Sequence, residues 1–393
     1  MDGSFEIGKL AGIPIKIHYT FFLIIPIFAI IIGTQIELTV SLVEQVFGLT
    51  EPIDASLITE GFMPYILGVL VAFLLFVGVF LHEMAHSVVA LRKGMKVSSV
   101  TLFILGGASE IEDEVSPRPR DELPMAIAGP LMSLFIGLVS EGIAYVSLIS
   151  IPDAAVAGLF FYIFGYLGIL NIVLFFFNLL PAFPMDGGRV LRALLAIWLP
   201  IEKATRIAAE IGRVVAIIFG IIGLITFNVI LILIAVFIYL GAGQEVTMVR
   251  YTQLLAGVKV RDAMTSPVAT VPPDMPVTVA MDLMYSTRHL GFPVIERGAL
   301  AGMITLHDIQ TASGIDRDAL QVRDIMTREV ITITPDHDLY DALKILAPNT
   351  IGRIPVVEDG QVTGIVTRTD ILKLMEIREV SGTARGHVVR PGQ

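Results

Sequence analysis

The chain contains no cysteine and carries little charge for its length. Of its 393 residues, 16% are Asp, Glu, Lys or Arg and 54% are hydrophobic, whereas soluble globular chains have about 25% charged residues. The lack of cysteine excludes disulfide bonds and thiolate metal ligands, so a metal site would need His, Asp or Glu. The net charge of −10 includes no basic run, which excludes a nucleic-acid partner. The composition predicts a protein that lies partly in a lipid bilayer.

The apolar excess is confined to residues 1–248, which we expect to form a multi-pass α-helical membrane domain of about six helices. The predicted spans are residues 17–33, 65–91, 125–150, 156–180, 207–225 and 229–248. Alternating patterns predict a β-hairpin in residues 1–16 and either a β-hairpin or a strand re-entering the membrane in residues 97–114, and residues 34–63 are interpreted as an acidic loop. The remainder of the chain has the composition of a soluble α/β segment.

The distribution of Lys and Arg predicts which side of the membrane each connection faces. Basic residues precede the first span and lie between the second and third and between the fourth and fifth, while the other three connections contain none. By the positive-inside rule every second connection is cytoplasmic, so both chain termini are expected in the cytoplasm of a multi-pass cell-membrane protein.

The most informative stretch is Leu81-His82-Glu83-Met84-Ala85-His86, inside the second predicted span. Two histidines four residues apart lie on one face of a helix, where their imidazoles can bind one metal ion beside the intervening Glu83. Ionisable residues without partners cost roughly 3 kcal/mol each in hydrocarbon, which disfavours a chance match. The pattern therefore predicts a zinc site with its general base.

Asp186 is the candidate for a third ligand. A catalytic zinc site usually has three protein ligands and one open position. Asp186 follows the fourth predicted span between Pro184 and Gly187-Gly188, which break a helix and let the carboxylate turn toward a neighbouring segment. An ordinary helix terminus would explain these residues too, but an intramembrane His pair elsewhere in the chain favours the ligand.

The two motifs together resemble the site-2 protease family of intramembrane zinc metalloproteases. The resemblance covers residues 1–248 and rests on the His82–His86 motif and on residues 178–188, NLLPAFPMDGG. It implies a metalloendopeptidase that binds one Zn²⁺ per subunit, with roles for His82, His86 and Asp186 as zinc ligands, Glu83 as general base and Asn178 as a catalytic polar group. Met185 stands where the family often has Leu, a change that conserves volume.

The resemblance also implies a substrate and a mode of presentation. The expected substrate is a single-span membrane protein, cleaved in or near its transmembrane segment by regulated intramembrane proteolysis. Gly106-Gly107 matches a glycine pair that the family places in a re-entrant loop, and an unwound substrate could add a strand to the edge of residues 97–112. Asn178 could donate to the developing oxyanion or could cap its helix.

The soluble segment contains an internal repeat with an offset of 62 residues. Val260-Arg261-Asp262-Ala263-Met264-Thr265 recurs as Val322-Arg323-Asp324-Ile325-Met326-Thr327, and a Gly-x-x-Thr-x-x-Asp element recurs as well. The copies resemble a tandem pair of cystathionine-β-synthase-type (CBS) domains, predicted as residues 258–316 and 317–380 after a linker at 249–257 and before a disordered tail at 381–393.

The CBS resemblance implies a regulatory ligand and an assembly. In that family the repeated Thr and Asp positions contact the ribose and phosphate of adenine nucleotides, which points to Thr305, Asp308, Thr367 and Asp370 as the site for ATP, ADP or AMP. The same residues could simply cap helices. If nucleotide binds, a shift between two arrangements could gate the membrane site, and the CBS domains could join two copies into a homodimer.

Two other functions stay open on the sequence alone. Paired CBS domains also follow ion channels and transporters, whose intramembrane polar residues line an ion path, although such a path does not need Glu beside a His pair. The second alternative is a metal-binding membrane scaffold without catalytic activity. The complete set of catalytic residues argues against it. His18 is interpreted as an interfacial anchor, and His289, His307, His337 and His387 lack metal-ligand spacing.

The predicted topology can be tested with an accessibility tag. A tag inserted beside Glu44 should be labelled by a membrane-impermeant reagent only from outside the cell, because the connection around it contains no Lys or Arg. A matching tag beside Arg118 should be labelled only from the cytosol. Labelling of the Glu44 tag from the cytosol alone would overturn the topology.

Overall fold

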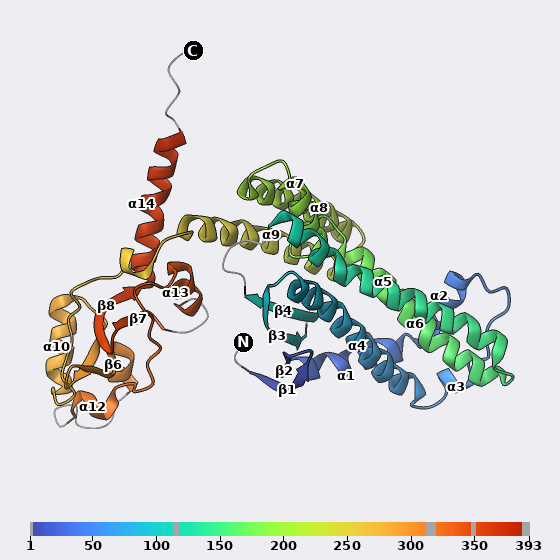
Figure 1. Cartoon of the computed structure of the whole chain (residues 1–393). Helices are drawn as coiled ribbons and strands as arrows, with labels where there is room; N and C mark the ends of the chain where they lie inside the picture. Colours follow the sequence, from blue (N-terminus) through green and yellow to red (C-terminus); the bar gives the residue numbers. More distant parts are fainter. Residues whose placement is uncertain (1–2, 105, 113–117, 312–319, 347–350, 387–393) are drawn as a thin grey trace, which may run out of the picture. The chain divides into compact units, whose positions relative to one another are not determined.

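The computed structural model describes residues 3–104, 106–112, 118–311, 320–346 and 351–386, and the chain divides into two compact units, Met1–Val249 and Arg250–Gln393. Figure 1 shows the first unit as a group of long helices with a small sheet on one side. Its elements in chain order are β1 Ser4–Leu10, β2 Ile13–His18, α1 Phe21–Thr34, α2 Ile36–Phe47, α3 Ser56–Thr59, α4 Met63–Arg92, β3 Lys96–Phe103, β4 Gly106–Glu112, α5 Pro119–Ser150, α6 Ala154–Asn178, α7 Asp186–Leu195, α8 Ile201–Ile225 and α9 Val229–Leu255.

Five helices of this unit, α4, α5, α6, α8 and α9, are long and apolar enough to cross a bilayer, and the count reaches six if α1 and α2 form one bent span. The first span was expected to be a single helix, and the structure differs from this expectation. The chain bends by 77° between α1 and α2, and α1 has only 14 residues, which is shorter than a bilayer requires.

The interpretation of residues 34–63 as a loop was wrong for α2. Its apolar residues Ile36, Val40 and Val43 recur at helical spacing and are buried, so they hold one face of α2 against the helix group. The acidic residues of this stretch made the helical spacing of its apolar residues hard to recognise in the sequence. The last residue of α2 is followed by Gly48 at φ 65°, which ends the helix.

A four-stranded sheet with the order β1-β2-β3-β4 confirms both predicted hairpins. β1 pairs antiparallel with β2, and β3 pairs antiparallel with β4. The hairpins join through a parallel pairing of β2 with β3, in which Ile15 lies opposite Val100. Ile13, Met84 and Val100 pack together, so the sheet lies against α4, and β4 forms one edge of the sheet.

Asp186 is the first residue of helix α7, so the expectation that Gly187-Gly188 breaks a helix was wrong. The two glycines begin α7 instead, because the connection from α6 folds back against them. A Cβ atom on Gly187 would lie 2.2 Å from the carbonyl oxygen of Leu180, so only glycine fits here. This close approach places the start of α7 beside the end of α6.

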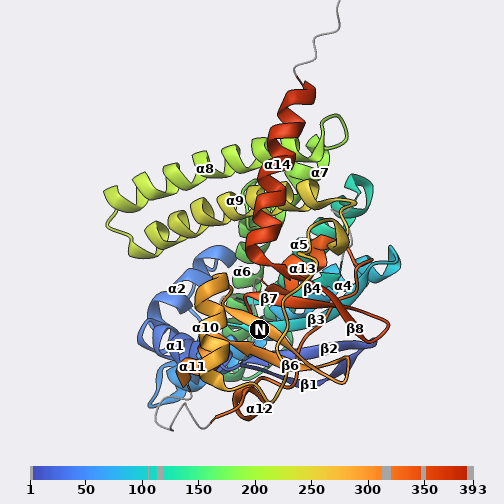
Figure 2. The ribbon, with the colours of Figure 1, turned by 90° about the vertical axis from the view of Figure 1, so that its left-hand side faces the viewer.

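The second unit contains two copies of one motif and confirms the repeat. Its elements are a short 3₁₀ turn at Val260–Asp262, α10 Val277–Thr287, β5 Gly291–Glu296, β6 Ala299–Thr305, α11 Leu306–Thr311, α12 Val322–Ile325, α13 Leu339–Leu346, β7 Arg353–Glu358, β8 Gln361–Thr367 and α14 Arg368–Gly386. Equivalent residues pair in parallel at Val271 with Val294 and at Ile333 with Val356. Figure 2 shows this unit from another side.

Helix α14 continues to Gly386, so the first six residues of the predicted disordered tail are helical. The last seven, 387–393, lie outside the described residues, as do Asp113 and Glu114 of the second hairpin. The finer domain boundaries stay predictions.

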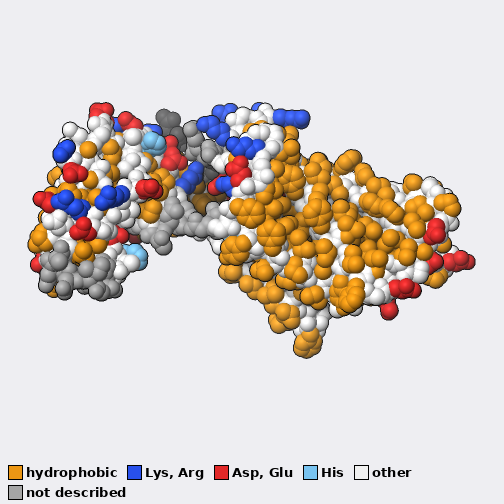
Figure 3. All heavy atoms as spheres, turned by 90° about the horizontal axis from the view of Figure 1, so that it is seen from below, with side chains coloured by type: hydrophobic (Ala, Val, Ile, Leu, Met, Phe, Trp, Pro, Cys, Tyr) orange, Lys and Arg blue, Asp and Glu red, His pale blue; other side chains and the backbone are white. Residues whose placement is uncertain are grey.

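The surface of the helical unit agrees with a lipid environment. Figure 3 shows hydrophobic side chains covering the visible face of this unit in one broad area. Large apolar side chains are exposed along every long helix; Phe135 of α5 is 63% exposed and Phe176 of α6 is 64% exposed. Such a continuous apolar surface is far larger than soluble monomers expose.

Candidate metal centre

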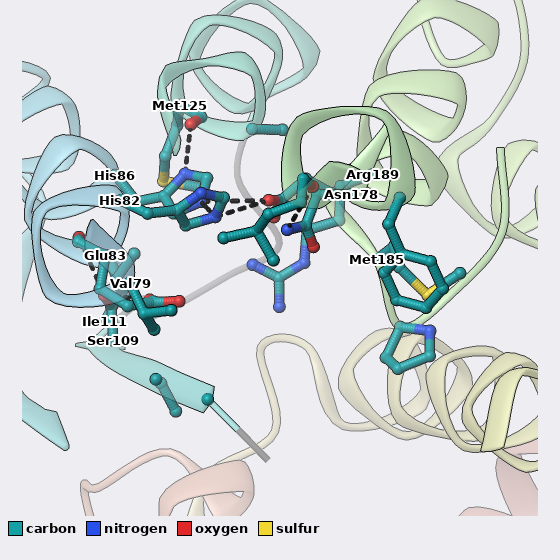
Figure 4. Close-up of a pocket in the computed structure, with 18 of the residues that line it drawn as sticks. Val79, His82, Glu83, His86, Ser109, Ile111, Met125, Asn178, Met185 and Arg189 are labelled. Carbon is teal, nitrogen blue, oxygen red and sulfur yellow. Dashed lines mark hydrogen bonds and ion pairs between the residues drawn. The ribbon is translucent and has the colours of Figure 1, made fainter. Parts of the chain in front are cut away.

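The structure brings His82 and His86 of α4 together with Asp186 of α7. Their nearest atoms are His82 Nε2 and His86 Nε2, which lie 3.1 and 3.2 Å from Asp186 Oδ2 and 3.2 Å from each other. Figure 4 shows the two imidazole rings side by side and pointing the same way. Both histidines are buried, at 5% and 8% exposure. Among the described residues, these three form the group that could hold a metal ion.

Hydrogen bonds on the far side of each ring fix the direction of its Nε2 atom. His86 Nδ1 lies 2.7 Å from the backbone oxygen of Met125, and His82 Nδ1 lies 2.9 Å from Ser133 Oγ, both on α5. A carbonyl oxygen only accepts hydrogen bonds, so Nδ1 of His86 carries the proton and Nε2 of the neutral ring keeps a lone pair. Histidines that ligate metals are commonly oriented in this way.

The donor atoms fit a zinc ion in type, number and spacing. Three atoms separated by 3.1 to 3.2 Å lie about 1.8 Å from the centre of their triangle, which is close to the ligand distance of about 2.0 to 2.1 Å that Zn²⁺ prefers. Two nitrogens and one carboxylate oxygen are typical ligands of catalytic zinc. The Nε2 lone pair of His86 and the Asp186 carboxylate face each other in a buried site, an arrangement that a cation balances.

Gly129 of α5 leaves the space that the cation needs. A Cβ atom at this position would lie 2.1 Å from His86 Nε2 and 2.6 Å from His82 Nε2. The first of these distances equals a zinc to nitrogen bond length of about 2.1 Å. Any other side chain would therefore occupy the coordination space, which explains a glycine at this point of a long helix.

Glu83 lies beside the histidines and is held by strand β4. Ser109 Oγ donates to Glu83 Oε2 at 2.8 Å and lies 3.2 Å from the backbone oxygen of Glu83. Ser87 Oγ donates in turn to Ser109 Oγ at 3.1 Å. A Cβ on Gly107 would lie 2.4 Å from Glu83 Cγ, so the second glycine of the Gly106-Gly107 pair gives the Glu83 side chain room.

The metal-ligand group opens into a cavity of about 400 Å³. The cavity is lined by the catalytic candidates of α4, by Gly106 to Ser109 and Ile111 of β4, and by Asn178, Asp186 and Arg189. Figure 4 shows part of this lining. The amide nitrogen of Asn178 donates to the backbone oxygen of Leu174 at 3.0 Å. In this structure Asn178 therefore bonds to its own helix, which is the second of the two roles considered for it. Its side chain still faces the same cavity.

Several residues of the site could not be found from the sequence. Ser109 and Ser133 belong to no motif that we recognised, and Gly129 suggested only close helix contact or a kink, although these residues lie directly against the two histidines and Glu83. His18 binds the hydroxyl of Thr20 at 2.8 Å and is not part of the metal-ligand group. This agrees with its interpretation as a structural residue.

In the second unit, the Thr and Asp pairs cap their helices. Asp308 Oδ2 accepts hydrogen bonds from the backbone nitrogen and the hydroxyl of Thr305, each at 2.7 Å. Asp370 Oδ2 accepts the same two bonds from Thr367, at 3.0 and 2.6 Å. Thr305, but not Asp308, lines a cavity of about 310 Å³ together with Thr327, Glu329 and Arg353.

Comparisons with known proteins identify the family of the chain. The model of peptidase family M50 matches residues 70–150 and 142–219, and the CBS domain model matches residues 260–314 and 322–377. A zinc metalloprotease of Methanocaldococcus jannaschii is 36% identical over 381 residues, which cover 97% of this chain and 98% of that protein. Rip3 of Mycobacterium tuberculosis is 30% identical over 392 residues, covering 96% and 94%.

Among solved structures, the site-2 protease from Methanocaldococcus jannaschii is 34% identical and covers 62% of this chain and 95% of its own, with a TM-score of 0.39. Among the sequence relatives of the second unit, a CBS domain-containing protein of Bacillus subtilis is 35% identical over 128 residues, which cover 32% of this chain and 91% of that protein.

The family models and the two full-length sequence relatives define the class, the zinc metalloprotease family followed by a CBS pair. The chain belongs to peptidase family M50. Family membership confirms the resemblance drawn from the two sequence motifs, and it favours the protease over the channel and transporter alternative.

Replacing Gly129 by Ala should abolish zinc binding, because the added methyl group would lie at metal-ligand distance from His86 Nε2. Zinc binding by the purified chain can be measured by competition with a chromogenic chelator. Gly142→Ala on the same helix is the matched control, since a Cβ there meets nothing within 4 Å. Wild-type zinc affinity in the Gly129→Ala protein would show that the cation lies elsewhere.

Proposed function

We propose that this protein is an intramembrane zinc endopeptidase that cleaves single-span membrane proteins in or near their transmembrane segments. The observation that carries the proposal is the convergence of three ligand atoms from α4 and α7 within 3.2 Å of one another, on a helix apolar enough to span a bilayer. His82, His86 and Asp186 hold one Zn²⁺, and Glu83 is the general base.

The depth of the site supports cleavage within the membrane. His82 precedes Arg92, the basic end of α4, by ten residues, which correspond to about 15 Å along a helix. With both chain termini and the basic connections in the cytoplasm, the site lies below the cytoplasmic surface of the cell membrane. Polar groups at that depth are tolerated where they line a cavity, as these do.

The chemistry follows from the side chains around the cavity. A bound zinc ion supplies a Lewis acid that polarises the scissile carbonyl and makes water more acidic. Glu83 takes the proton of the attacking water and returns it to the leaving amine. Ser109 holds one Glu83 oxygen and so leaves the other free for this transfer. Asn178 lines the cavity and can donate to the developing oxyanion after it releases the Leu174 carbonyl.

Strand β4 is the expected docking edge for substrate. A helical substrate has its carbonyl groups hydrogen-bonded, so it must unwind locally before attack. β4 is an edge strand of the sheet, and its residues Gly106 to Ser109 and Ile111 line the cavity that contains the metal-ligand group. A substrate strand added to this edge would lie extended beside Glu83.

We also propose that the CBS pair binds an adenine nucleotide and regulates the protease. The cavity beside Thr305 combines residues of both copies and has apolar walls, including Leu290 and Ile331. Arg353 lines it, and burial lowers the pKa of this guanidinium, so a phosphate group would compensate a desolvated charge. A homodimer through the CBS domains stays a prediction.

Replacing Glu83 by Gln should leave zinc binding intact and lower the rate of cleavage by at least about 10²-fold, because the amide cannot accept the proton of water. The assay uses purified full-length protein and a single-span model substrate, with fragments identified by mass. Glu60→Gln, which changes an exposed residue, is the control and should cleave as the wild type does. A zinc chelator should inhibit both the wild type and Glu60→Gln. Wild-type cleavage by Glu83→Gln would remove the base assignment.

Titration calorimetry of the full chain with ATP, ADP and AMP should show heat of binding for at least one nucleotide. Arg353→Gln should weaken that binding about tenfold or more, since it removes the half-buried positive charge of the cavity. Arg323→Gln, which changes an exposed arginine, should bind as the wild type does. No heat with any of the three nucleotides would rule out the regulatory proposal and leave the protease proposal untouched.

A further inference from the structure

Arg192 is a buried arginine on the helix that carries Asp186. The sequence places it among the basic residues that mark a cytoplasmic connection, but in the structure it is only 7% exposed. It lies on α7 six residues after Asp186. A guanidinium retains its charge when buried, so it needs partners.

The partners of Arg192 come from three other segments. Its Nε donates to Glu122 Oε1 of α5 at 2.9 Å, and its Nη2 forms an ion pair with the same oxygen. Its Nη1 forms an ion pair with Glu245 of α9. The guanidinium carbon also lies 5.3 Å from the centre of the Phe183 ring, which belongs to the connection just before Asp186.

These contacts link the segments that build the metal-ligand group. Glu122 lies one turn before Met125 on α5, and the backbone oxygen of Met125 orients His86. Arg192 and Phe183 lie on either side of Asp186 in the chain. One planar guanidinium therefore holds the Asp186 segment against the helix that orients a histidine, and the fixed fork of arginine makes this geometry specific.

Stability alone is a weak explanation for this cluster. It combines one positive charge with two carboxylates, and the second oxygen of Glu122, which is 1% exposed, has no hydrogen-bond partner among the described residues. Well-packed apolar residues often stabilise a fold as much as a buried ion pair does. A role in orientation accounts for a charged cluster that packing would not require.

We propose that Arg192 is a positioning residue for the metal centre, which acts on zinc through Asp186 by fixing α7 to α5 and α9. The inference rests on the proposed function, because it assumes that Asp186 ligates zinc. Glu245 brings α9 into the same cluster. The position of α9 therefore affects the geometry of the metal-ligand group.

The test is the zinc affinity of full-length variants in detergent, measured by chelator competition. Arg192→Gln should raise the zinc Kd by about 10- to 100-fold, as loss of a group that orients a ligand commonly does. Arg192→Lys keeps the positive charge but lacks the planar guanidinium that bonds two partners at once. This variant and Glu245→Gln should raise the zinc Kd by smaller factors. Arg206→Gln, an exposed arginine on α8, is the matched control and should leave the Kd unchanged.

Thermal unfolding of the zinc-free proteins separates positioning from a structural role. The inference predicts weaker zinc binding by Arg192→Lys and Glu245→Gln at an unchanged unfolding temperature of the zinc-free form. It is overturned if both variants bind zinc as the wild type does, or if their loss of affinity only follows a loss of folded protein. A wild-type chain that binds no zinc would instead contradict the proposed function.

Discussion

The structure depends on one buried meeting of three atoms, two imidazole nitrogens and one carboxylate oxygen, each within 3.2 Å of the others. In the interior of an apolar helix group, such an arrangement is costly unless a cation balances it. The surrounding residues serve this arrangement in separate ways. Met125 and Ser133 turn the rings, Gly129 leaves the space, and the start of α7 supplies the carboxylate.

The local parts of this site could be predicted from the sequence, because they follow from short-range rules. A His-Glu-x-x-His stretch on a helix places two imidazoles on one face, and an apolar run of that length identifies the helix as a membrane span. Asp186 could be proposed because a zinc site with two histidines lacks a third ligand. The repeat of 62 residues and both hairpins likewise follow from local patterns.

The rest of the site depends on contacts between segments that are far apart in the chain. Such contacts cannot be predicted from the pattern of a single sequence. Gly129 resembles any glycine of a membrane helix until the two Nε2 atoms are placed beside it, and Ser109 is an ordinary strand serine until Glu83 reaches it. Arg192 reads as a surface charge because its carboxylate partners are 70 and 53 residues away along the chain. The bend after α1 was missed for a related reason, since acidic residues concealed the apolar face of α2.

The central claim is that two histidines and Asp186 hold one zinc ion, and X-ray absorption at the zinc edge of the loaded, full-length protein tests it most directly. The account predicts one zinc per chain with two imidazole nitrogens and oxygen ligands at about 2.0 to 2.2 Å. It also predicts that the imidazole signal disappears when His82 and His86 are both replaced by Ala. A zinc ion that keeps its imidazole ligands in that variant, or that shows none in the wild type, would contradict the claim.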